Sequence, residues 1–184
     1  VYKRQIPYSN NLDFHDVPVR KYIQAHINKP VYVANDANAA AYGEFVAGAA
    51  KGAKNAVCIT LGTGVGAGII VDGKILTGSN LAGAELGHMV IEVDGPQCTC
   101  GRKGCFEVFS SATGLIRMTK EAAEADSSSI LNKYLAEDGK FSARHAFMAM
   151  RDGDKAGTEV VEKYCKYLAA GITNTINILS LIHI

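Results

Sequence analysis

The sequence predicts an α/β fold, and three observations support that prediction. A short β-branched run at 31–34 leads directly into an Ala-rich helical stretch. Residues 56–61 form a second apolar strand, and the apolar runs that follow are joined by Asp72-Gly73, the strongest local hairpin signal in the chain. Beyond Glu107 the apolar spacing is helical, so strands are expected mainly in the first half and helices in the second.

The composition is that of an ordinary globular chain. Its 184 residues are 48% hydrophobic, which is enough to build a packed core. The net charge is +1, from 19 basic and 18 acidic residues, and therefore predicts neither a nucleic-acid nor a membrane partner. No apolar run approaches the roughly 20 residues of a membrane span, and the first residues lack the apolar core of a signal peptide, so we expect a cytoplasmic protein.

Residues 1–28 predict a polar loop followed by a short amphipathic helix beginning near Pro18. After the strand at 31–34, Asn35 and Asp36 open the next helix. Both residue types are favoured N-caps, so a purely structural explanation is available. The same position puts a carboxylate at the carboxyl end of a strand, where open α/β sheets bind ligands.

Four helices are expected in the second half of the chain. The predicted N-cap serines are Ser111 for a helix over 112–125, Ser127 or Ser128 for one ending at Ala136, and Ser142 for one ending at Arg151. The fourth helix runs from Lys155 to about Leu179 and carries one apolar face. Core positions are expected for three methionines and two cysteines, namely Met118, Met148, Met150, Cys58 and Cys165.

Gly62-Thr63-Gly64 separates the strand at 56–61 from the hairpin. Glycine at these positions lets backbone N–H groups approach phosphate oxygens. A tight turn without any ligand explains the same pattern. The turn is neither a P-loop nor a Rossmann fingerprint, because Gly-Lys-Ser/Thr is absent and a hairpin, not a helix, follows.

One histidine and three cysteines lie within eighteen positions: His88, Cys98, Cys100 and Cys105. They form the ligand set of a closed Cys3His zinc site, although their C-x-C-x4-C spacing differs from the usual C-x2-C and buried free thiols remain the alternative. Glu85 and Glu107 bracket this set, so a bound metal would fix two acceptors suited to sugar hydroxyls. Five cysteines, an odd number, fit a reducing compartment better than a disulfide framework.

Three stretches resemble the ROK family of repressors and sugar kinases, and most closely its bacterial glucokinases. They are Asn-Asp-Ala-Asn-Ala-Ala-Ala-Tyr-Gly-Glu at 35–44, Gly-Ala-Glu-Leu-Gly-His at 83–88, and Cys-Thr-Cys-Gly-Arg-Lys-Gly-Cys-Phe-Glu at 98–107. The Gly62–Gly64 turn also resembles the second phosphate motif of the actin, Hsp70 and sugar-kinase superfamily, and the Asn11-Leu12 pair resembles a family segment ahead of the catalytic strand.

The resemblance implies the actin-like ATPase fold (ribonuclease H-like) with an inserted zinc loop at 88–105, and transfer of the γ-phosphoryl group of ATP to the 6-hydroxyl of a hexose, glucose first. Asp36 falls on the catalytic base of the family. The implied ligands are Asn35, Glu85, His88 and Glu107 for the sugar, Gly62, Thr63 and Gly64 for ATP, and His88, Cys98, Cys100 and Cys105 for a structural Zn2+. His88 would ligate the metal through one ring nitrogen and face the sugar with the other.

The resemblance covers about 8–179. Residues 1–30 are interpreted as a link from a missing N-terminal lobe, 31–179 as the sugar-binding lobe, and 180–184 as an atypical tail. The first phosphate loop of the family, with its Mg2+-associated aspartate, and the adenosine-side segment have no counterpart in this sequence. We therefore expect this chain alone to be inactive. The resemblance also implies that the complete protein is a homodimer.

Three alternatives stay open. A sugar-sensing ROK repressor could keep the zinc loop and the sugar site, and only then would a nucleic acid be a partner. Kinases for N-acetylmannosamine, fructose or allose share most of these residues. A purely structural zinc module is the least favoured, since it leaves Asp36 and Gly62–Gly64 without a purpose.

Overall fold

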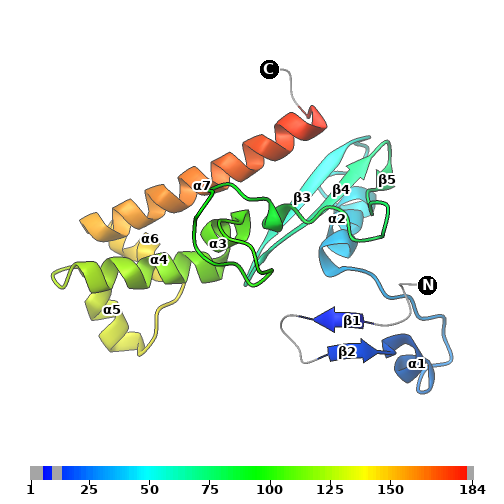
Figure 1. Ribbon diagram of the computed structural model, residues 1–184, viewed down its shortest axis with the longest axis horizontal. Helices are drawn as coiled ribbons and strands as arrows, with labels where there is room; N and C mark the ends of the chain where they lie inside the picture. Colours follow the sequence, from blue (N-terminus) through cyan, green and yellow to red (C-terminus); the bar gives the residue numbers. More distant parts are fainter. Residues whose placement is uncertain (1–5, 10–13, 182–184) are drawn as a thin grey trace. The chain divides into compact units, whose positions relative to one another are not determined.

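The structure confirms the predicted α/β class (Figure 1). This computed structural model describes residues 6–9 and 14–181. The strands are β1 (Ile6–Ser9), β2 (Phe14–Val17), β3 (Ala56–Leu61), β4 (Val65–Val71) and β5 (Lys74–Ile75). The helices are α1 (Val19–Gln24), α2 (Asp36–Ala47), α3 (Phe106–Ser110), α4 (Ala112–Ala125), α5 (Leu131–Asp138), α6 (Arg144–Arg151) and α7 (Lys155–Leu179), with a short 3₁₀ turn, η2 (Leu86–His88). None of these helices combines the length and apolar character needed to span a membrane.

The chain divides into two compact units. Unit 1 comprises Val1–Cys58 and Gly68–Ala84, and unit 2 comprises Ile59–Ala67 and Glu85–Ile184. Strands β3, β4 and β5 form one sheet in that order, and β4 pairs antiparallel with β5 through Ile70 and Ile75. The predicted Asp-Gly turn joins them, with φ of 48° at Asp72 and 73° at Gly73. This is the left-handed geometry that a tight hairpin turn requires.

In unit 1, helix α2 lies close against β4. A Cβ atom at Gly68 would lie 2.3 Å from the Cβ of Ala41, so only glycine permits this approach. Asn35 is the N-cap of α2, and its side-chain oxygen accepts a hydrogen bond from the backbone N–H of Asn38 at 2.9 Å. The cap predicted from the sequence is confirmed.

Two predictions for unit 1 are wrong. The expected polar loop contains an antiparallel hairpin of β1 and β2, in which Tyr8 pairs with His15. Residues 31–34 form no strand, and within the described part of the chain no segment pairs with them. Both errors have one cause, because strand formation depends on a partner that local composition does not reveal. The Asn11-Leu12 pair and residues 182–184 of the expected tail lie outside the described residues.

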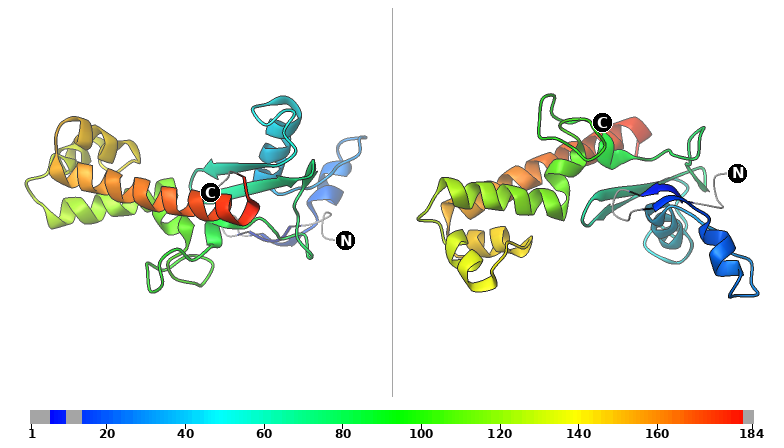
Figure 2. Two further views of the ribbon diagram at one scale, coloured as in Figure 1. Left: turned by 90° about the horizontal axis from the view of Figure 1, so that it is seen from above. Right: turned by 60° about the horizontal axis from the view of Figure 1, so that its bottom comes forward.

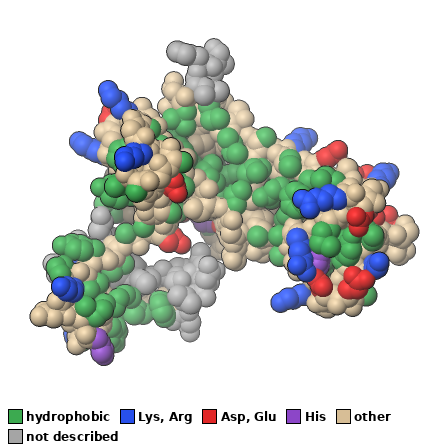
Figure 3. Space-filling view, turned by 180° about the vertical axis from the view of Figure 1, so that it is seen from behind, with side chains coloured by type: hydrophobic (Ala, Val, Ile, Leu, Met, Phe, Trp, Pro, Cys, Tyr) green, Lys and Arg blue, Asp and Glu red, His purple; other side chains and the backbone are tan. Residues whose placement is uncertain are grey.

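In unit 2, helix α7 lies alongside α4 and α6 and also contacts α3 (Figures 1 and 2). Two apolar clusters fill the spaces between these helices. The first has at its centre Leu115, Met118, Ala146, Val160 and Val161, and the second Ala123, Leu131, Tyr134, Ala149 and Ala156. Met148 and Met150 pack against these clusters, as predicted for core methionines. On the face shown in Figure 3, basic and acidic side chains are interspersed over this helical region.

The predicted bounds of α4 and α7 are confirmed. The Ser111 cap is confirmed as well, because the Ser111 hydroxyl accepts a hydrogen bond from the N–H of Gly114 at 3.0 Å. The other serine caps are wrong. Helix α5 begins at Leu131, and the Asp154 carboxylate accepts from the N–H of Ile130 at 3.0 Å. Helix α6 begins at Arg144, and the buried hydroxyl of Ser142 has no hydrogen-bond partner within the described residues.

The apolar face of α7 is only partly buried. Val161 is buried, whereas 37% of Ile172 is exposed. Cys165, expected in the core, is exposed, and Cys58 is half-buried. Besides Val160 and Val161, α7 buries two small residues in its second half, Gly171 and Thr175, and the ring of Phe106 lies against the helix at Gly171. Apolar period alone does not show such a small-residue contact.

Candidate functional site

The four predicted metal ligands come together in unit 2. His88 ends η2, Cys98 and Cys100 lie on the loop that follows, and Cys105 immediately precedes α3. Their ligand atoms all lie within 4.8 Å of one another. The Sγ of Cys98 is 3.7 Å from Nδ1 of His88, and the Sγ atoms of Cys100 and Cys105 are 3.6 Å apart. Cys98 and Cys105 are buried, so the cluster is largely enclosed.

These donors fit zinc. A tetrahedral zinc with Zn–S bonds of about 2.3 Å separates two sulfur ligands by about 3.8 Å, close to the spacing of Cys100 and Cys105. Three thiols and one imidazole are also the soft donors that zinc prefers, and the closed set leaves no position for a reacting water. The residues therefore suit a structural metal.

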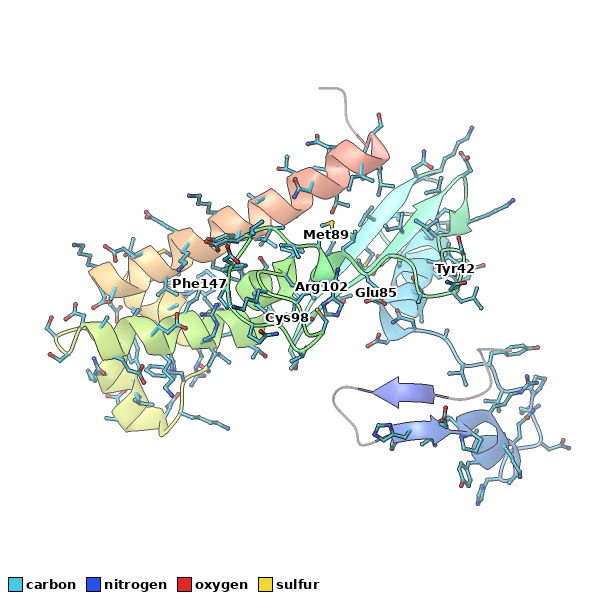
Figure 4. All side chains as sticks on the ribbon, viewed as in Figure 1. Tyr42, Glu85, Met89, Cys98, Arg102 and Phe147 are labelled. Atoms are coloured by element: carbon cyan, nitrogen blue, oxygen red, sulfur yellow. The ribbon has the colours of Figure 1, made fainter. Side chains whose placement is uncertain are left out.

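Glycines shape the loop that carries the candidate metal ligands. Gly101 and Gly104 have φ of 90° and 67°, values that favour glycine. At Gly104 a Cβ would lie 1.6 Å from the carbonyl oxygen of Glu92, so no other residue fits there. The N–H of Cys98 donates to the carbonyl of Arg102 at 2.8 Å and closes the turn that carries Cys100. Figure 4 shows Cys98 and Arg102 on this loop beside α3.

The protonation of the thiols differs within the cluster. The backbone N–H of Arg102 is the main cause that lowers the pKa of Cys100 to about 6, since it donates a hydrogen bond to the thiolate. Burial raises the pKa of Cys105 to about 12. Cys100 is therefore the better thiolate of the two, and Cys105 needs a bound cation to deprotonate at neutral pH.

Glu107, the second residue of α3, connects the metal cluster to the glycine turn. Its Oε2 accepts a hydrogen bond from the backbone N–H of Val65 at 2.9 Å, and its Oε1 lies 4.0 Å from Sγ of Cys98. A Cβ at Gly64 would lie 2.3 Å from the same Oε2, so glycine is required for this approach. The carboxylate is half-buried and keeps acceptor capacity beyond the Val65 bond.

The Gly62–Gly64 turn lies between β3 and β4, as predicted. The N–H of Gly62 donates to the carbonyl of Gly64 at 3.0 Å. The carbonyl oxygens of Gly62 and Thr63 accept hydrogen bonds from α4, whereas the N–H groups of Thr63 and Gly64 have no acceptor within the described residues. The turn therefore presents two donors that are free to bind an anion.

Glu85 lies at the N-terminal end of η2, close in the chain to His88 (Figure 4). Its backbone carbonyl accepts from the N–H of His88 at 3.1 Å, and its side chain is exposed. Gly87 packs η2 against the start of β4, because a Cβ there would lie 2.2 Å from the carbonyl oxygen of Val65. Glu85 and His88 are thus held near the turn by this glycine contact.

Asn35 and Asp36 belong to unit 1. The Asn35 side chain is engaged as the N-cap of α2, and Oδ1 of Asp36 accepts from the N–H of Ala37 at 2.9 Å. Both side chains are exposed, and the second carboxylate oxygen of Asp36 accepts no hydrogen bond within the described residues. The arrangement accounts for the local helix cap, and a catalytic role for Asp36 stays a prediction.

Sequence reasoning missed the residues that hold the glycine turn. Thr113 donates its hydroxyl hydrogen to the carbonyl of Thr63 at 2.8 Å, and the N–H of Ala112 donates to the carbonyl of Gly62 at 2.8 Å. Neither residue carries a local signal of this role, since a threonine in the first turn of a helix is common in any sequence. The contact from Thr113 joins positions 50 apart.

The sequence matches the ROK family over residues 2–184. The glucokinase of Thermotoga maritima is 38% identical over 168 residues, 91% of this chain and 53% of the relative. The xylose repressor of Bacillus subtilis is 32% identical over 176 residues, 95% of this chain and 41% of the relative. The chain thus spans about half the length of the curated glucokinases that it matches.

Among solved structures, a ROK family glucokinase from Streptomyces griseus, in complex with glucose and AMPPNP, superimposes with a TM-score of 0.84 at 33% identity. The match covers 97% of this chain and 59% of that one. The fold of the described residues is therefore that of ROK sugar kinases, as the motifs predicted. Sequence and fold agree, and the chain belongs to the ROK family.

Proposed function

We propose that the complete gene product phosphorylates a hexose with ATP, glucose being the first candidate substrate. The observation that carries this proposal is the glycine turn, in which two N–H groups without an acceptor among the described residues lie next to the Glu107 carboxylate. A repressor that only senses sugar has no use for a phosphate-binding turn. The likeness to glucokinases, one of them in complex with glucose and AMPPNP, supports the same choice.

Asp36 is the proposed general base, because it matches the family's catalytic position and its carboxylate is exposed. Phosphoryl transfer requires mainly positioning and charge neutralisation, plus an acceptor for the proton of the attacking hydroxyl. Asp36 would take that proton from the 6-hydroxyl as the oxygen attacks the γ-phosphorus of ATP, the bond to the bridging β–γ oxygen breaks and ADP leaves. The side-chain amide of Asn35 would form a hydrogen bond with a neighbouring sugar hydroxyl, either as donor or as acceptor.

Glu85, His88 and Glu107 are proposed to bind the remaining sugar hydroxyls. Acceptors held in fixed positions discriminate strongly against sugars that leave them unpaired. The N–H groups of Thr63 and Gly64 would bind the phosphates of ATP, and Mg2+ would accompany the nucleotide. A zinc ion on His88, Cys98, Cys100 and Cys105 would supply no chemistry beyond holding this loop in shape.

The test of the kinase proposal is Asp36→Asn in the complete gene product, with the 184-residue chain assayed in parallel. The amide keeps the size of the side chain but cannot accept the proton, so kcat should fall about 10²–10⁴-fold while sugar affinity changes far less. The matched control is Asp72→Asn, since asparagine tolerates the left-handed turn position. If Asp36→Asn retains turnover within a few-fold of its parent, Asp36 is a helix cap and not the base.

A sugar-sensing repressor is the second candidate, favoured by the 32% identity to the Bacillus subtilis xylose repressor. A gel-shift assay with sugar-responsive promoter DNA, run beside the coupled kinase assay, separates the two functions. DNA binding that a sugar abolishes, without any phosphorylation, would establish the repressor. A substrate panel of glucose, N-acetylmannosamine, fructose and allose would then identify the sugar of a kinase. A homodimeric state and a cytoplasmic location stay predictions from the family resemblance and the composition.

A further inference from the structure

Three consecutive peptide groups in the glycine turn are each fixed by a residue from the segment 107–113. The carbonyl between Gly62 and Thr63 accepts from the N–H of Ala112 at 2.8 Å. The carbonyl between Thr63 and Gly64 accepts from the hydroxyl of Thr113 at 2.8 Å. The N–H between Gly64 and Val65 donates to the carboxylate of Glu107 at 2.9 Å.

Fixing a carbonyl also fixes the N–H of the same peptide group. A trans peptide is planar, and its C=O and N–H point in opposite directions. The bond from Thr113 to the Thr63 carbonyl therefore aims the N–H of Gly64 away from α4, and the bond from Ala112 does the same for the N–H of Thr63. Those two N–H groups are the donors of the turn that have no acceptor among the described residues.

The three hydrogen bonds differ in whether a substitution can remove them. The Ala112 donor is a backbone group at the start of a 14-residue helix, so its presence depends only on α4. The Thr113 donor is a side chain on an exposed residue, and the peptide group that it holds has glycine on one side. Glycine permits a peptide flip that would exchange the N–H of Gly64 for the Thr63 carbonyl.

We propose that Thr113 is a positioning residue for the phosphate-binding turn, holding the Thr63–Gly64 peptide with its N–H toward the nucleotide. The proposal rests on the proposed kinase function for the identity of the anion, but not for the orientation of the peptide. A flipped peptide would present a carbonyl oxygen to a phosphate, which is repulsive. The hydroxyl of Thr113 therefore acts on ATP binding without touching ATP.

The test compares Thr113→Val, Thr113→Ala and Thr113→Ser with Thr158→Val as the matched control. Thr158 also donates its hydroxyl to a backbone carbonyl at the start of a helix, that of Asp154 at 2.8 Å, but far from the turn in sequence. Because Thr113 is exposed, these variants should fold, and the melting temperature of each one checks this.

The first readout needs no enzymatic activity. In NMR spectra of the 184-residue chain, Thr113→Val and Thr113→Ala should shift the Thr63 carbonyl and Gly64 amide signals and show a second turn conformation, whereas Thr113→Ser and Thr158→Val should not. Unchanged signals in both Thr113→Val and Thr113→Ala would overturn the proposal. A shift in Thr113→Ser as large as in Thr113→Val would overturn it too, because the methyl group and not the hydroxyl would then matter.

The second readout is kinetic and uses the complete gene product. The KM for ATP should rise about three- to tenfold in Thr113→Val, the factor that corresponds to one neutral hydrogen bond, and Thr113→Ser should restore it. The KM for the sugar should stay unchanged. An equal rise in both KM values would contradict the positioning role. If the parent protein has no kinase activity while the NMR shifts appear, the proposed function fails and the orientation of the turn by Thr113 stands.

Discussion

The carboxylate of Glu107 is bound to the backbone of Val65 at 2.9 Å, across 42 positions of sequence. This bond joins the first turn of α3, which follows the last metal ligand, to the strand that leaves the glycine turn. The same carboxylate is a proposed sugar ligand, and its Oε1 lies 4.0 Å from Sγ of Cys98 in the candidate metal cluster. The loop of candidate metal ligands, the proposed sugar ligand Glu107 and the glycine turn are therefore parts of one connected structure within unit 2.

Alanine substitutions at the two glycines of the turn should have unequal effects. In Gly64→Ala the new Cβ would lie 2.3 Å from Oε2 of Glu107, so the Val65 bond should break and the free energy of unfolding should fall by about 1–3 kcal/mol. Gly62→Ala is the matched control, since its new methyl group would meet no atom within 4 Å. Urea unfolding of both variants measures the difference, and equal stability would argue against the Glu107 contact.

Removal of one metal ligand should release the metal. If the cluster binds zinc, the purified, reduced chain should contain one zinc per molecule, and Cys100→Ser should lose it and destabilise the loop. Metal analysis by mass spectrometry of freshly purified protein makes the measurement.

Cys165→Ser is the control for the metal experiment, because Cys165 is an exposed free thiol outside the cluster. It should keep the full zinc content. Absence of zinc from the unmutated, reduced protein would show that the four residues are buried free thiols and an imidazole.

Gly171→Ala should destabilise unit 2, although alanine is the better helix former. A Cβ at Gly171 would lie 2.3 Å from the ring of Phe106, and overpacking of this kind costs about 1–3 kcal/mol. Gly43→Ala in α2 is a control in which the change in stability should have the opposite sign, since its Cβ would meet no atom within 4 Å. That variant should be stabilised by about 0.5–1 kcal/mol, the usual difference in helix propensity. Thermal unfolding monitored by circular dichroism should show a lower melting temperature for Gly171→Ala and a higher one for Gly43→Ala.

The ionisation of Asp138 should make the stability of the fold depend on pH in the acid range. The hydrogen bond from Arg144, and next the one from His145, lowers the pKa of this carboxyl below its ordinary value. A lowered pKa stabilises the fold above the ordinary value of the unfolded chain, and this contribution is lost as the pH falls through the folded pKa. Arg144→Ala should therefore raise the pKa of Asp138 toward 3.8 in an NMR titration. Lys140→Ala, two positions from Asp138, should leave the pKa of Asp138 unchanged.

Local signals in the sequence predicted those features that depend on a few neighbouring residues. Ser111 binds the N–H of Gly114 three positions later, and Asp72-Gly73 adopts the left-handed turn that both residue types favour. The metal cluster belongs to the same class, because its four ligands fall within eighteen positions and a short loop brings them together. Metal binding by this cluster, and zinc as the metal, stay predictions.

Features that depend on distant residues could not be predicted. Asp154 replaces the expected serine cap of α5 because its carboxylate reaches the N–H of Ile130, 24 positions earlier. The bonds from Glu107 and Thr113 to the glycine turn span 42 and 50 positions, and no period or motif encodes them. The exposure of Cys165 has a related reason, since contacts to distant residues such as Phe106 decide which face of α7 is buried.

The length of sequence that each contact spans also bears on the order in which the protein folds during synthesis. The metal ligands span eighteen positions, whereas the Tyr167 hydroxyl reaches Glu92 across 75. Closing a short loop costs little chain entropy, so the metal loop can form while α7 is still inside the ribosome. The loop leads into Phe106, whose ring is the surface on which Gly171 of α7 later packs. A zinc-bound loop would then offer a preformed surface on which α7 packs.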